Sequence, residues 1–145
     1  MNNMTITKQY RLLPEVAGQL GKHTQLDSSV HPPRIFHLHF IFDGWLGDDI
    51  IECFPCFLIT ESMLEKLNHI HLTGYSSKDA EISSSELYKD LHPNRDLPNF
   101  KWLIINDNLG DDFFLDKKNY LMVSERAMEI LKQYGKLEHC EIEEI

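Results

Sequence analysis

The chain lacks several features that mark whole classes of protein. Its most apolar stretch, residues 35–42, is far too short to span a bilayer and contains two histidines. Three cysteines are too few, and odd in number, for a disulfide framework. Basic residues are scarce, with 14 Lys and Arg against 23 Asp and Glu, so the net charge is −9. We therefore expect no binding to nucleic acid or membranes, because both need clustered Lys and Arg.

Signals for export and for common enzyme families are also missing. The amino terminus, MNNMTITKQYR, has no apolar segment of the kind found in secretory signals. The sequence contains no Walker loop and no GxGxxG, GxSxG or HExxH motif. We accordingly expect a cytoplasmic protein with reduced thiols that is not an enzyme and uses no cofactor or metal. The sequence leaves the oligomeric state open.

The length and the hydrophobic pattern predict one α+β domain over residues 1–145, with a mixed, largely antiparallel sheet and a few short helices packed on it. The expected strands are residues 34–42, about 50–59, 100–105, 113–115, 120–123 and 137–142. The expected helices are residues 61–69, a short helix to about residue 91 with Ser83 and Glu86 as its capping box, and residues 124–134. Residues 14–33, with several Pro, Gly and Ser, are expected to form a long loop.

A strand, an acidic turn, a second strand, a Ser/Thr-Glu cap and a helix occur twice in this order. The sequence LGDD stands at residues 46–49 and again at residues 109–112. FLITE at residues 57–61 is matched by LMVSE at residues 121–125, in almost the same register. This pattern indicates a degenerate internal duplication. The alternative is chance recurrence, since turns and caps draw on few residue types. The repeat units are expected at residues 34–90 and 99–145.

Acidic residues gather in two windows that contain no Lys or Arg, one between Arg34 and Lys66 and one over residues 102–116. Acids without neighbouring cations keep their negative field, which speeds association with a basic cleft. The alternative is that these acids are solvated turn residues, and that Trp45 covers the core and is not an exposed anchor. The predicted partner-binding residues are Asp43, Trp45, Asp48, Asp49, Glu52, Asp107, Asp111, Asp112 and Asp116.

A second set of residues has the chemistry of a zinc site. His37 and His39 alternate along an expected strand, so both imidazoles face one side, and Cys53 and Cys56 form a CxxC pair. A zinc-dependent small hydrolase that uses these four residues is therefore one alternative function. The opposing interpretation is that the cysteines are buried and the histidines hydrogen-bonded within the fold.

The C-terminal third of the chain carries FKWL at residues 100–103, DFFL at residues 112–115 and VSERA at residues 123–127, followed by a short helix and an acidic strand. This run resembles the immunity proteins of bacterial polymorphic-toxin systems, such as contact-dependent or type VI secreted effectors. The resemblance implies an α+β fold, no catalysis, and the binding and silencing of a toxin encoded beside the immunity protein.

The expected function is therefore neutralisation of a cognate toxin that acts in the cytoplasm, by occlusion of its active site with an acidic surface. A nuclease ranks first among such toxins, because a cleft that holds phosphates is basic. An intracellular adapter with another protein partner is a further alternative, since it shares the absence of enzymatic motifs.

Overall fold

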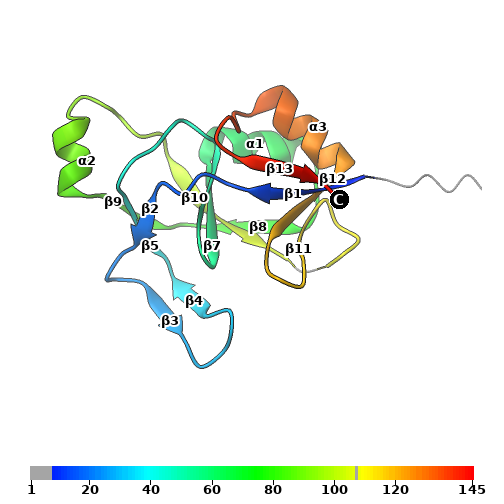
Figure 1. Ribbon diagram of the computed structural model, residues 1–145, viewed down its shortest axis with the longest axis horizontal. Helices are drawn as coiled ribbons and strands as arrows, with labels where there is room; N and C mark the ends of the chain where they lie inside the picture. Colours follow the sequence, from blue (N-terminus) through cyan, green and yellow to red (C-terminus); the bar gives the residue numbers. More distant parts are fainter. Residues whose placement is uncertain (1–7, 107) are drawn as a thin grey trace, which may run out of the picture.

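The computed structural model describes residues 8–106 and 108–145 (Figure 1). The strands are β1 (Gln9–Leu13), β2 (Gly18–Leu20), β3 (Gln25–Asp27), β4 (Arg34–His37), β5 (His39–Phe42), β6 (Ile50–Cys53), β7 (Cys56–Thr60), β8 (Tyr75–Lys78), β9 (Glu81–Ser84), β10 (Phe100–Ile105), β11 (Phe113–Leu115), β12 (Leu121–Ser124) and β13 (Glu141–Glu144). The helices are α1 (Glu61–Ile70), α2 (Glu86–Leu91) and α3 (Glu125–Tyr134). The chain has an α+β fold, as the sequence predicts.

Two four-stranded antiparallel sheets form the body of the molecule, in the orders β6-β7-β10-β8 and β11-β12-β1-β13. A smaller sheet, β2-β5-β9, contains the parallel pair β5 and β9, and β3 pairs with β4 alone. The architecture is therefore mixed and largely antiparallel. No helix in the described parts of the chain is long and apolar enough to cross a membrane.

The two four-stranded sheets are built in the same way. In each, a hairpin leads into a helix and then into a strand, giving β6-β7-α1-β8 and β11-β12-α3-β13. The remaining strand of each sheet lies between the hairpin and the strand that follows the helix, and it is β10 in the first sheet and β1 in the second. Along the chain, β1 precedes the hairpin β6-β7 and β10 precedes the hairpin β11-β12. In space, each of these strands lies in the sheet of the other hairpin, so the two units exchange a strand. A hairpin, a helix and a strand in this order therefore occur twice, whereas residues 34–42, expected as the first strand of the first repeat unit, form β4 and β5 in other sheets.

Strand β7 shows why the core has two parts. Phe57 and Ile59 face the cluster that the helices cover, whereas Cys56 and Leu58 face the cluster that includes β5. A strand buried on both faces has a continuous apolar sequence, as CFLI does. The helices contribute Met63, Leu64 and Leu67 from α1 and Ala127, Met128 and Leu131 from α3.

Two expected strands are each divided in the structure. The strand expected at residues 34–42 breaks at Leu38, so that β4 pairs with β3 while β5 joins the three-stranded sheet. The strand expected at about residues 50–59 is a hairpin, because Phe54 and Pro55 form the turn between β6 and β7. Proline has no N–H for a sheet ladder and suits a turn.

Other boundaries also differ from the expectations. Residues 14–33 are not one loop, since they contain β2 and β3. The helix α2 is capped by Ser85 and not by Ser83, because the Ser85 hydroxyl accepts the Tyr88 amide. The last strand begins later than residue 137 and covers Glu141–Glu144. Strands β1, β8 and β9 were not predicted, and β8 and β9 contain serines in place of an apolar alternation.

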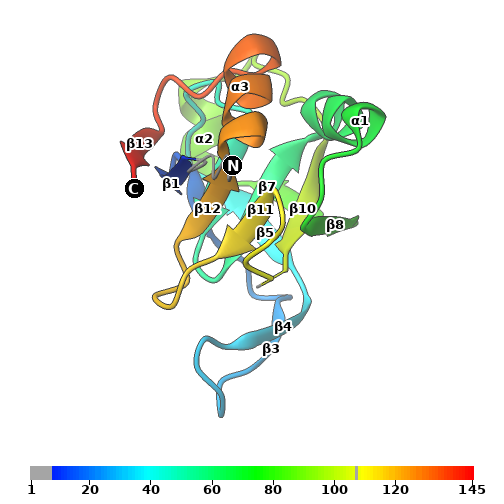
Figure 2. The same cartoon turned by 90° about the vertical axis from the view of Figure 1, so that its right-hand side faces the viewer.

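The hairpin of β3 and β4 projects away from the rest of the molecule in both views (Figures 1 and 2). We call residues 25–37 the arm. It belongs to residues 14–49, which separate β1 from β6 in the first unit, whereas residues 106–112 alone separate β10 from β11 in the second. Residues 79–99, with β9 and α2, are likewise inserted between β8 and β10.

Candidate functional site

The last aspartate of each LGDD turn has the same structural role. Asp49 Oδ1 accepts the Thr60 hydroxyl at 2.7 Å, and Asp49 Oδ2 accepts the Lys136 amide at 2.7 Å. These partners lie just before α1 and just after α3. Asp49 therefore ties the start of its own unit's helix to the end of the other unit's helix.

Asp112 repeats this arrangement in the second unit. Its Oδ1 accepts the Ser124 hydroxyl at 2.7 Å, and its Oδ2 accepts the Thr73 amide at 2.9 Å. Ser124 precedes α3 and Thr73 follows α1. Both carboxylates are half-buried and engaged within the fold, so they are not simply solvated turn residues.

Asp48 does not lie on an exposed recognition surface, which corrects the expectation for this residue. Its side chain is buried, with 1% of the residue exposed, and its Oδ2 accepts the His139 amide at 2.9 Å. Desolvation in this position raises the pKa of the Asp48 carboxyl. The Asp48 side chain is therefore unavailable to a partner in this conformation.

Asp43 and Trp45 lie in the first turn and remain half-exposed. Asp43 Oδ2 accepts the Gln19 side-chain amide at 3.1 Å. The Trp45 ring packs edge-on against Phe100, with ring centroids 5.7 Å apart, and the Arg95 guanidinium lies 4.9 Å from its centroid. Trp45 thus packs against the core, its Nε1 donates to the Asp48 carbonyl at 2.9 Å, and the Arg95 guanidinium lies over its ring.

The remaining predicted acids occupy separate places. Burial raises the pKa of the half-buried Glu52 carboxyl. Asp111 is half-buried, and Asp116 Oδ1 accepts the amides of Lys118 and Tyr120 at 2.8 and 3.0 Å within its own turn. Asp107 lies outside the described residues. The structure therefore does not join the described acids of the two turns into one free acidic face.

A buried carboxylate that the sequence analysis missed holds the first turn in place. Glu15 is buried, and its carboxylate accepts the amides of Leu46 and Asp48 at 2.6 and 3.4 Å. Such backbone donors are the partners that a buried charge needs. No local pattern in the sequence pairs a glutamate with a turn so far along the chain.

The arm carries large apolar side chains in the open. Phe36 is 55% exposed, and Leu26 and Val30 are also exposed. In the turn between β6 and β7, Phe54 is 52% exposed, and its ring centroid lies 6.2 Å from that of His31 in the arm. Several exposed large apolar side chains on one projecting segment are typical of a contact site. The signal in the sequence was the presence of Leu26 and Val30 in a stretch that otherwise has loop composition.

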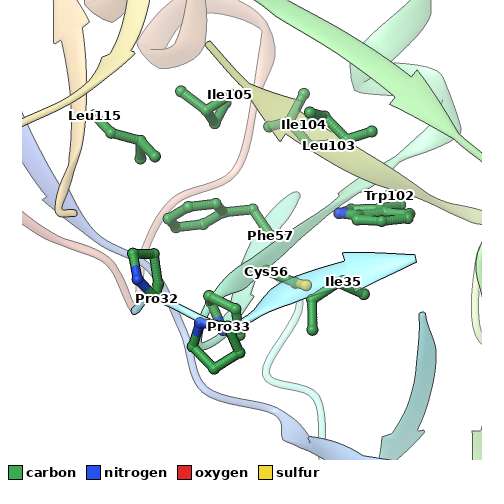
Figure 3. A pocket seen from close by; sticks show the side chains of 11 residues that line it. Pro32, Pro33, Ile35, Cys56, Phe57, Trp102, Leu103, Ile104, Ile105 and Leu115 are labelled. Carbon is green, nitrogen blue, oxygen red and sulfur yellow. The ribbon is translucent and has the colours of Figure 1, made fainter. Parts of the chain in front are cut away.

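An apolar cavity of about 150 Å³ lies where the arm meets the body (Figure 3). The arm contributes Pro32, Pro33 and Ile35 to its lining, while Phe57 and Trp102 line it from β7 and β10. Pro32, Pro33 and Ile35 of the arm therefore border this cavity, whereas Leu26, Val30 and Phe36 are exposed to solvent.

Three histidines surround one glutamate at the base of the arm. His23 Nδ1 lies 2.6 Å from Glu81 Oε2, and His37 Nε2 lies 3.0 Å from Glu81 Oε1. The buried His39 places its Nε2 2.9 Å from Ser83 Oγ and 3.6 Å from Glu81 Oε2. We call His23, His37, His39 and Glu81 the imidazole cluster. The hydrogen bond with His23, and to a smaller extent that with His37, lowers the pKa of Glu81 to about 2.

Backbone contacts from three segments position this cluster. The parallel register of β5 and β9 sets His39 beside Glu81. The Gly21 amide donates to the His39 carbonyl at 2.7 Å, and the His39 amide donates to Thr24 Oγ1 at 3.1 Å. The His39 ring lies so close to Gly21 that a Cβ there would overlap it. The segment before the arm is thus packed directly against β5.

The zinc ligand set suggested by the sequence is not assembled. His37 and His39 converge on Glu81, and the potential metal-binding group among the described residues consists of His23, His39 and Glu81. Burial raises the pKa of Cys53 to about 11 and that of Cys56 to about 12. The raised pKa of both thiols disfavours the thiolate form that zinc binds.

Comparisons with known proteins found no significant match to this chain among protein-family models, curated proteins or solved structures.

Proposed function

We propose that the chain is an immunity-type inhibitor that binds and neutralises a cognate bacterial toxin domain, and that the arm makes the central contact. One observation carries the proposal: exposed Leu26, Val30 and Phe36 stand on a projecting hairpin, and exposed Phe54 of the β6–β7 turn lies near His31 of this hairpin. Protein interfaces have an apolar, often aromatic centre, and a few such side chains supply most of the binding energy.

The proposal moves the contact away from the acidic turns. Asp48, Asp49 and Asp112 accept hydrogen bonds from within the fold, and their removal would disturb the fold as well as any interface. The net charge of −9 contributes at long range, where it steers the chain toward a basic cleft and speeds association. A nuclease therefore ranks first among the candidate toxins, and the inhibitor itself performs no reaction.

Co-expression with a toxin tests this proposal. The probe is the C-terminal domain of the large secreted protein expected in the adjacent reading frame. Cells that produce this domain are expected to survive when the chain is present and to die without it. The double variant Phe36→Ser and Phe54→Ser should lose protection, because it removes the exposed phenylalanine of the arm and the exposed phenylalanine of the β6–β7 turn near His31.

Leu109→Ser is the matched control, because Leu109 is exposed in the second LGDD turn and its removal is expected to leave protection intact. Equal killing with and without the chain contradicts the proposed function. Full protection by the double variant, with circular dichroism confirming that it folds, would place the contact elsewhere on the molecule.

A further inference from the structure

We propose that His23, His39 and Glu81 bind a divalent transition-metal ion, best matched by Zn²⁺, and that His37 orients Glu81 for this role. The proposal is independent of the proposed inhibitor function, since it concerns the purified chain alone.

The ligand atoms already lie close together. The candidate donor atoms of His23, His39 and Glu81 are all within 4.8 Å of one another. Zinc ligands lie about 2.0–2.2 Å from the ion, so small movements of side chains bring three such atoms into one coordination shell. Two imidazoles and one carboxylate, with water in the remaining position, form a common zinc ligand set. Mg²⁺ and Ca²⁺ prefer oxygen ligands and fit this set poorly.

The ligands are held by different segments, which gives the site some rigidity. His39 is buried in β5, and Glu81 stands beside it in the parallel strand β9. His23 comes from the segment before the arm, and its ring stacks on His39 with centroids 4.8 Å apart. His23 and Glu81 are partly exposed, so an ion can enter from solvent.

His37 has the position of an orienting partner. Its Nε2 lies 3.0 Å from Glu81 Oε1, whereas His23 and His39 approach Oε2. A metal-bound carboxylate is usually hydrogen-bonded by a neighbour, and loss of that neighbour weakens metal binding. His37 therefore acts on the ion through Glu81.

Metal binding would change one hydrogen bond in a predictable way. At present the His23 amide donates to His39 Nδ1 at 3.3 Å, the longest hydrogen bond in the cluster. A neutral imidazole that binds metal through Nε2 carries its proton on Nδ1. Binding of the ion therefore breaks the hydrogen bond from the His23 amide to His39 Nδ1, because a protonated Nδ1 cannot accept it. The chemical shift of the His23 amide is expected to change as a result.

The position of the site gives the ion a structural consequence. His23 precedes β3, and His37 ends β4 and pairs with Gln25 at the base of the arm. His39 and Glu81 belong to the three-stranded sheet of the body. A bound ion would therefore clamp the base of the arm to the body, in addition to the existing hydrogen bonds.

Calorimetric titration of Zn²⁺ into the chelator-treated full chain at neutral pH tests the site. A single ion per chain is expected to bind, with a rise in the melting temperature as zinc is added. Glu81→Gln keeps the size of the side chain and should weaken zinc binding about 100-fold, because a neutral amide is a poor ligand. His37→Gln should weaken it about 10-fold. Substitution of Co²⁺ gives a visible spectrum that identifies nitrogen ligation.

His69→Gln is the matched control, since His69 is exposed on α1 and stands apart from the cluster. It should bind zinc as the wild type does. Amide NMR is expected to show the His23 resonance shifting on zinc addition and not shifting in Glu81→Gln. Absence of stoichiometric binding at millimolar zinc, equal affinity of wild type and Glu81→Gln, or equal weakening by His69→Gln would overturn the proposal.

Discussion

The two repeated units of this chain share one scaffold and differ in what is inserted into it. In the second unit, residues 106–112 alone connect β10 to β11, whereas in the first unit residues 14–49 connect β1 to β6 and residues 79–99 connect β8 to β10. The arm and the imidazole cluster lie entirely within these insertions. The second unit makes the corresponding connection through residues 106–112 alone, so the strand connection does not require the length of residues 14–49, and inserted segments of this kind often carry function.

The largest expected effect tests whether the two units are stabilised in the same way. Asp49→Ala and Asp112→Ala should each lower the free energy of unfolding by about 2–4 kcal/mol, because Asp49 is a charged acceptor of two hydrogen bonds and Asp112 of three. The measurement is urea unfolding of each variant. Similar losses would support equivalent roles for the two aspartates.

Asp90→Ala serves as the control for this pair, since Asp90 is exposed on the short helix α2. Its effect should remain within about 0.5 kcal/mol, as for most surface substitutions. A loss at Asp49 with none at Asp112 would show that only the first unit depends on this connection, and the structural equivalence would then have no energetic counterpart.

The sequence predicted the scaffold better than the insertions, and the reason is physical. The recurrence of LGDD and of the Ser/Thr-Glu caps is local, and it located the turns and the helices α1 and α3. The same letters did not reveal that Asp49 and Asp112 point inward, because their partners at Lys136 and Thr73 are distant in sequence.

The candidate site was the least predictable part of the molecule. Histidines 37 and 39 were identified as potential ligands, but His23 and Glu81 were not. Glu81 reaches His39 through the parallel pairing of β5 with β9, and such a pairing leaves no short-range signal. The arm was interpreted as part of a loop because its strands are short and lie among Pro, Gly and Ser.

A smaller difference in the free energy of unfolding is expected between alanine variants of the glycines in the two LGDD turns. Gly47 has a φ of 109°, whereas Gly110 lacks a φ in this left-handed region. No neighbouring atom lies within 4 Å of a Cβ built at either position. Gly47→Ala should therefore lower the free energy of unfolding by about 1 kcal/mol through backbone strain alone, and Gly110→Ala should change it by less than about 0.5 kcal/mol.

Urea unfolding of both alanine variants measures this difference. Since both sites have room for a methyl group, packing does not complicate the comparison. Equal losses would mean that the two turns adopt the same backbone conformation in solution, contrary to the structure.

The smallest expected effect is a pH dependence that distinguishes Asp48 from Asp111, which occupies the same position in the second turn. Burial raises the pKa of Asp48 in the folded chain above its ordinary value of 3.8. The folded state therefore binds this proton more tightly than the unfolded state does. The resulting stabilisation is fully present below pH 3.8 and is lost as the pH rises through the raised pKa.

The variant Asp48→Asn is expected to lack this pH-dependent decrease in stability, because asparagine does not titrate. Its side-chain amide oxygen can still accept the His139 amide. The stability of Asp48→Asn relative to the wild type is therefore expected to increase as the pH rises from acid toward neutral. Melting temperatures measured across this range test the trend, and Asp111→Asn supplies the baseline for replacing a turn carboxyl. A constant relative stability of Asp48→Asn would show that the pKa of Asp48 is not raised by burial, and a relative stability that falls with pH would show that hydrogen bonds to the carboxylate outweigh desolvation.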